Sequence, residues 1–116
     1  MLNKLLFHER CNNDVLLIAS KIKPLGNVTL NKFKDQLMEV YQLIYENRNS
    51  GLTLFSQGLD VFSKNRDIRF IEITHFDCYV VYKVKPHAIV IVLGIIERKR
   101  IWHDLSKINF GVVTNI

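Results

Sequence analysis

The sequence is poor in cysteine, proline and glycine. Its 116 residues contain two cysteines, two prolines and five glycines. No internal repeat, low-complexity tract or flexible linker interrupts the chain. We expect the cysteines, Cys11 and Cys78, to be free thiols, which indicates a reducing compartment.

Long hydrophobic runs are also absent. The longest runs from Ala88 to Ile96, about half of what a membrane-spanning helix needs, and its β-branched residues favour a buried strand. The apolar stretch before His8 is too short for a signal peptide. We therefore expect a cytoplasmic protein without a membrane partner.

Positive charge exceeds negative charge, with 16 Lys and Arg against 11 Asp and Glu, a net charge of +5. This balance favours an anionic or acidic partner, although it also fits a basic protein with no such partner.

Hydrophobic residues make up 48% of the chain, enough for one core. We therefore expect a single domain spanning residues 1–116.

Two stretches of helical spacing predict a helical hairpin. Pro24 and Gly26 end the first helix and form the turn. Apolar positions three and four residues apart define one face of each helix: Val15, Ile18, Ala19 and Ile22, then Leu30, Phe33, Leu37, Val40 or Tyr41, and Ile44. The capping residues that we expect are Asn12, Asn13 or Asp14 for the first helix and Asn27 or Thr29 for the second.

Strand patterns lie on both sides of this hairpin. Leu5 to Phe7 is a short first strand, and residues 50–67 form a packed connection after the helices. From Ile68 the apolar period changes to two, and turns at 75–77 and 85–87 separate three antiparallel strands. The predicted fold is α+β, an antiparallel sheet packed against an N-terminal helical hairpin in the order β-α-α-β-β-β.

This order of elements resembles the RelE/ParE superfamily of bacterial type II toxin-antitoxin toxins. The best-matching segments are Asp67-Ile68-Arg69, Tyr79-Val80-Val81-Tyr82-Lys83-Val84, and Ile89 to Ile96 followed by Arg98-Lys99-Arg100. The resemblance implies a toxin that stops growth until a cognate antitoxin wraps its cleft, with no metal and no cofactor. The antitoxin would dock on the Ser50 to Asn65 connection and the groove between helices and sheet.

The same fold serves two chemistries in this family. Ribosome-dependent messenger RNA endonucleases place cations and an acid or base around the scissile phosphate. Similarity to them implies Arg69, Arg98, Arg100 and His103 as catalytic residues. The position where many of them carry a cation is Thr74 here, so the chain resembles the DNA gyrase-poisoning members slightly more. In that case Arg98, Arg100 and Trp102 bind the partner. A member without toxicity is a third alternative.

Each of these residues also has a purely structural interpretation. The basic segment 98–100 is a solvated strand exit in the simplest case, but alternation puts Arg98 and Arg100 on one face if the strand continues. Trp102 is more typical of a core anchor. Arg69 pairs with a neighbour or binds a target. Tyr79 and Tyr82 point to opposite faces, and we expect Tyr82 in the core.

Two His-x-x-Cys pairs supply the ligand types of a tetrahedral zinc site. They are His8 with Cys11, at a strand-to-helix junction, and His75 with Cys78, in a hairpin turn. A zinc site requires these two places to meet in the fold. Because the resemblance implies no metal, we expect none.

Overall fold

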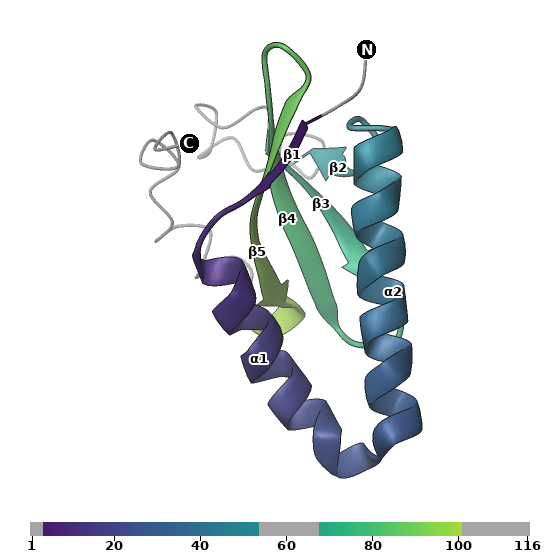
Figure 1. Ribbon diagram of the computed structural model, residues 1–116. Helices are drawn as coiled ribbons and strands as arrows, with labels where there is room; N and C mark the ends of the chain where they lie inside the picture. Colours follow the sequence, from purple (N-terminus) through teal and green to yellow (C-terminus); the bar gives the residue numbers. More distant parts are fainter. Residues whose placement is uncertain (1–3, 54–67, 101–116) are drawn as a thin grey trace.

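The computed structural model describes residues 4–53 and 68–100. Two helices, α1 (Arg10–Ile22) and α2 (Asn27–Glu46), lie on one face of a five-stranded sheet (Figure 1). The strands are β1 (Lys4–Phe7), β2 (Leu52–Thr53), β3 (Ile68–Ile73), β4 (Cys78–Lys85) and β5 (Ile89–Glu97). The predicted α+β class, with a helical hairpin against a sheet, is confirmed.

The sheet order is β1-β5-β4-β3-β2. The last three strands form the predicted antiparallel meander, with Phe70 opposite Val81 and Val81 opposite Gly94. The first strand joins this meander in parallel, since Leu5 lies opposite Val90 of β5. The sheet is therefore mixed rather than antiparallel as predicted, and β2 is a strand that the predicted order lacked. The helical hairpin carries the chain across one face of the sheet, from β1 at one edge to β2 at the other.

The hairpin turn follows the prediction, but the helix starts do not. A short 3-10 helix, η1 (Lys23–Leu25), contains Pro24 and joins the two helices. Gly26 follows it with φ of 108°, a left-handed value that favours glycine, and it is the N-cap of α2. The α1 helix begins at Arg10, earlier than the predicted caps. Instead, Nδ1 of His8 accepts the N–H of Arg10 at 3.1 Å.

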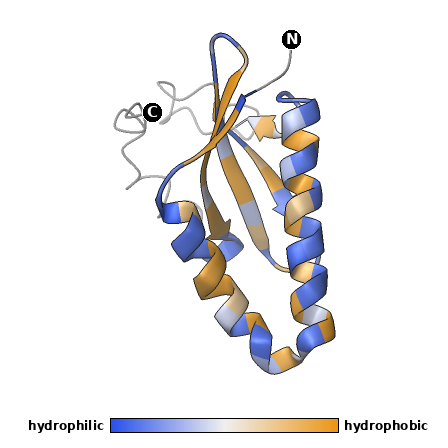
Figure 2. Ribbon diagram, in the orientation of Figure 1, coloured by the Kyte–Doolittle hydropathy of each residue, from blue (hydrophilic) through white to orange (hydrophobic). Residues whose placement is uncertain are grey.

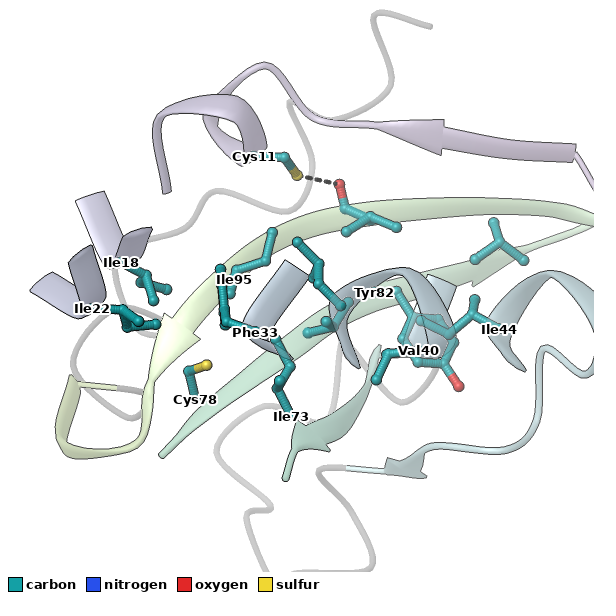
Figure 3. Close-up of a cluster of buried hydrophobic side chains, with 14 residues drawn as sticks. Cys11, Ile18, Ile22, Phe33, Val40, Ile44, Ile73, Cys78, Tyr82 and Ile95 are labelled. Carbon is teal, nitrogen blue, oxygen red and sulfur yellow. Dashed lines mark hydrogen bonds between the residues drawn. The ribbon is translucent and has the colours of Figure 1, made fainter. Parts of the chain in front are cut away.

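Apolar residues of both helices meet the sheet in one large cluster. Its helical members are those of the predicted periods except Ala19, which is not among them, and they include Cys11, which the periods did not. Figure 2 shows hydrophobic residues on α1 and α2 alternating with polar ones. In Figure 3, Phe33 and Ile44 of α2 lie over Ile73 and Tyr82 of the sheet. Tyr82 is fully buried, which confirms its predicted place in the core.

A second cluster occupies the other face of the sheet. It contains Phe70, Val81 and Leu93, all buried, with Tyr79 packed against Phe70 at a ring-centroid distance of 5.4 Å. Tyr79 and Tyr82 therefore lie on opposite faces, as their spacing predicts. Burial on both faces explains why β5 is a nearly continuous apolar run rather than an alternating one.

Candidate functional site

The basic segment after the last strand is the main candidate site predicted from the sequence. Strand β5 ends at Glu97, and the next three residues form a 3-10 helix, η4 (Arg98–Arg100). The backbone N–H of Arg98 donates to the carbonyl of Asp77 at 2.7 Å, which fixes the start of η4 against the β3–β4 turn. The prediction that Arg98 and Arg100 share a face required β5 to continue through them. The strand ends before them, so this condition is not met.

The two arginines border different cavities. Arg100 lies at a cavity of about 370 Å³ between α1 and the end of β5, together with Arg10 and Leu17. Arg98 lies at a separate cavity of about 320 Å³ beside Phe76 and Asp77 of the β3–β4 turn. The two cations thus border different cavities, which both include Glu97 in their lining.

Glu97 partly offsets the charge of this segment and ties it to the helices. Its carboxylate accepts a hydrogen bond from Nζ of Lys21 on α1 at 2.5 Å, and it lies 4.0 Å from Nζ of Lys99. The hydrogen bond from Lys21 lowers the pKa of Glu97. The carboxylate is thus held ionised and is poorly suited to act as a general acid.

Arg69, the other predicted catalytic cation, is engaged with the backbone. Its Nη1 donates to the carbonyl of Gly51 at 2.8 Å and to that of Asn49 at 3.2 Å. Tyr82 holds the same segment, since its hydroxyl accepts the N–H of Gly51 at 2.8 Å and donates to the carbonyl of Arg48 at 3.0 Å. Arg69 therefore fastens the chain after α2 to the sheet through these two carbonyls.

The structure also contains a polar cluster that the sequence analysis missed. Asp14 is 9% exposed, and its Oδ2 accepts Nε of Arg10 at 2.9 Å and the N–H of Ile95 at 3.1 Å. The pairing of β4 with β5 shifts register next to these residues, between Val81 and Tyr82. The register shift leaves Leu93 without a partner, whereas Ile95 lies opposite Val80. The carboxylate of Asp14 supplies the acceptor for the buried amide of Ile95.

One signal in the sequence pointed to this contact. Gly94 interrupts an otherwise apolar strand, and a glycine inside a strand often marks a bulge or a close approach. A Cβ at Gly94 would lie 2.8 Å from Oδ2 of Asp14 and 3.0 Å from Nε of Arg10. The glycine therefore makes room for the ion pair of α1.

Both thiols, Cys11 and Cys78, are free and buried. Cys11 donates to the carbonyl of Val92 at 3.2 Å, drawn as a dashed line in Figure 3. Burial raises the pKa of Cys11 and that of Cys78 to about 12. In residues 4–53 and 68–100 no three His, Cys, Asp or Glu side chains gather as metal ligands, so the two His-x-x-Cys pairs do not form one site.

A third cavity, of about 470 Å³, lies between the start of α1 and the middle of α2. Phe7, Val15, Leu37 and Tyr41 supply most of its apolar wall, and Phe7 meets Tyr41 edge to face at 5.1 Å. Phe7 is 45% exposed, so part of this wall is open to solvent. The cavity lies between the two helices, beside the end of β1.

The remaining predicted site residues, Trp102 and His103, lie outside the described residues, as does most of the predicted connection, 54–67. Leu52, at its start, is 55% exposed in the edge strand β2.

The chain matches no protein-family model and no curated protein. Among the described residues, no helix is both long enough and apolar enough to cross a membrane.

Proposed function

We propose that this protein is the toxin of a type II toxin-antitoxin module, acting in the cytoplasm by binding a macromolecular target and neutralised by a cognate antitoxin. The observation that carries the proposal is the order of elements on which the resemblance rests. One strand, a helical hairpin, the short strand β2 and a three-stranded meander follow each other, and η4 (Arg98–Arg100) follows the last strand.

Within this proposal, binding to DNA gyrase is favoured over cleavage of messenger RNA on the ribosome. A nuclease needs cations gathered around one phosphate. Arg69 donates to two loop carbonyls, and Arg98 and Arg100 border different cavities. A binding protein requires no such convergence, and charges at separate places suit an extended contact.

For the antitoxin we propose the cavity beside Phe7 and Tyr41. Apolar walls with a partly exposed aromatic ring are typical of the centre of a protein interface. The antitoxin would bury this ring on binding. Replacing Tyr41 by Lys should therefore weaken capture of the neighbouring gene product, while Tyr45→Lys, on the same helix, serves as the matched control.

Toxicity is tested by induced expression in a bacterial host. We expect growth arrest, and we expect co-expression of the neighbouring gene to restore growth. Normal growth with abundant folded protein would contradict the toxin proposal.

The target is tested in the same cells and with purified components. A gyrase poison should induce the DNA-damage response, leave transcripts intact and trap cleaved plasmid with purified gyrase. Transcripts cut within translated regions, without DNA damage, would instead establish the messenger RNA endonuclease and reverse our ranking.

A further inference from the structure

The turn of the helical hairpin carries a surface that the proposed function does not use. We call residues 21–32 the hairpin tip. In Figure 1, η1 and the adjoining helix ends lie at the opposite end of the molecule from the β4–β5 turn. Two apolar side chains project there, Leu25 at 70% exposure and Val28 at 84%. Figure 2 shows hydrophobic and hydrophilic residues side by side at this turn.

Leu25 and Val28 do not belong to the hydrophobic core. The packing positions at the tip are taken by Ile22 and Phe33, which are 7% and 0% exposed. Between Ile22 and Phe33, the ring of Pro24 restricts the backbone, and Gly26 adopts the left-handed φ that the turn requires. Leu25 and Val28 are thus presented on a preformed turn, and a partner that contacts them need not first order it.

The charged side chains of the tip segment itself are all positive. Residues 15–34 contain four lysines and no Asp or Glu. Lys21 bridges to Glu97 of the sheet with its side chain still 57% exposed. Lys23 and Lys32 are exposed on either side of the apolar pair. The tip therefore complements a negatively charged surface that also offers apolar contact.

We infer that the hairpin tip binds the surface of a membrane rich in anionic phospholipid. Leu25 and Val28 would enter the boundary between headgroups and acyl chains, and Lys23 and Lys32 would meet lipid phosphates. A nucleic-acid backbone also attracts lysine, but it offers little to an exposed Leu and Val. This contact is peripheral and needs no spanning helix. It therefore departs from the expectation of no membrane partner, which was based on the absence of long apolar runs.

The full-length protein is tested by sedimentation with vesicles of phosphatidylglycerol and phosphatidylcholine, compared with phosphatidylcholine alone. We expect binding to the anionic vesicles only, and its loss in about 1 M salt, where charges are screened within about 3 Å. Lys23→Ala with Lys32→Ala should weaken binding about 30-fold. Leu25→Ser with Val28→Ser should weaken it about tenfold.

Matched controls separate the tip from overall charge and hydrophobicity. Lys4→Ala with Lys85→Ala removes the same charge at the other end of the molecule, and Met38→Ser removes an apolar side chain, 63% exposed, from the middle of α2. Both controls should bind like the unchanged protein. Equal losses in controls and tip variants would overturn the inference.

Binding to duplex DNA is measured with the same variants. If the tip variants lost DNA binding while vesicles were not bound, the tip would be a nucleic-acid contact and the membrane inference would be wrong. None of these measurements uses growth as a readout, so their outcome is independent of whether the protein is a toxin.

Discussion

Tyr82 and Arg69 act at the level of single residues to hold the segment after α2. The Tyr82 hydroxyl accepts from Gly51 and donates to Arg48, while Arg69 donates to Asn49 and Gly51. Burial raises the pKa of Tyr82, so the hydroxyl stays protonated and keeps its role as a donor. Four backbone hydrogen bonds thus depend on two side chains of neighbouring strands.

Replacing Tyr82 by Phe tests this role. The N–H of Gly51 and the carbonyl of Arg48 lose their partner, so we expect the free energy of unfolding to fall by about 1 to 2 kcal/mol. Chemical denaturation measures the change. Tyr79→Phe, which keeps its ring against Phe70 on the other face, is the control and should change the free energy by less than about 0.5 kcal/mol. Equal effects of the two substitutions would contradict the role.

The two thiols supply a second prediction at this scale. Because Cys11 and Cys78 are buried, a thiol-specific disulfide reagent should leave the native protein unmodified at neutral pH. Both thiols should react once the protein is unfolded in denaturant. Rapid reaction of either thiol in the native state would show that its burial is wrong.

The same thiols predict a loss of stability in alkali. Burial raises each pKa from 9.0 in the unfolded chain to about 12 in the folded protein. The unfolded state therefore releases protons first, and the free energy of unfolding should fall as the pH rises from 9.0 to about 12. Denaturant titrations at several pH values measure this slope. A flat profile over that range would contradict it.

At the scale of elements, the join between α1 and β5 decides how the hairpin sits on the sheet. Asp14 bonds the amide of Ile95 at the bulge, Cys11 donates to the carbonyl of Val92, and Lys21 pairs with Glu97. These contacts follow one side of α1 from its first turn to its last. The position of α1 and the backbone of β5 from Val92 to Glu97 therefore depend on each other.

Gly94→Ala tests this dependence. The new methyl group would lie 2.8 Å from Oδ2 of Asp14, so we expect a loss of about 1 to 3 kcal/mol in the free energy of unfolding. Asp14→Ala should also destabilise the protein, by about 1 to 3 kcal/mol, because the Ile95 amide loses its acceptor. The double variant should lose less than the sum, since the clash is gone once Asp14 is removed. Strict additivity would argue against the contact.

At the scale of the whole molecule, the basic segment at the end of the sheet is the surface on which the proposed function depends. Arg98 and Arg100 are both exposed. Nη1 of Arg98 lies 3.9 Å from Oδ1 of Asp77, a distant ion pair. Ion pairs this exposed contribute little to folding. The segment can therefore be changed without loss of the fold.

Arg98→Ala with Arg100→Ala should abolish toxicity in the expression test. Thermal stability should stay within about 0.5 kcal/mol of the unchanged protein, as is usual for surface substitutions. Lys4→Ala with Lys85→Ala, which removes the same charge elsewhere, should remain toxic. The single variants then show which of the two cavities meets the target. A fully toxic double variant would move the functional surface to the helical hairpin.

The sequence by itself determined the local elements. Helical periods, the Pro24 and Gly26 turn, and the change to a period of two at Ile68 each depend on residues close in the chain, so they are readable from it. The opposite faces of Tyr79 and Tyr82 follow from the same geometry. The helix start was misread because His8, rather than an Asn or Asp further along, accepts the first amide.

Only the tertiary structure decided which distant groups meet. The parallel pairing of β1 with β5, the burial of Asp14 under the bulge, and the attachment of Arg69 to loop carbonyls each join residues distant in the chain. The position of η4 has the same origin, because its first amide, that of Arg98, donates to the carbonyl of Asp77 in the β3–β4 turn. A local pattern fixes which way a side chain points within its element, whereas its partner is set by how the elements pack.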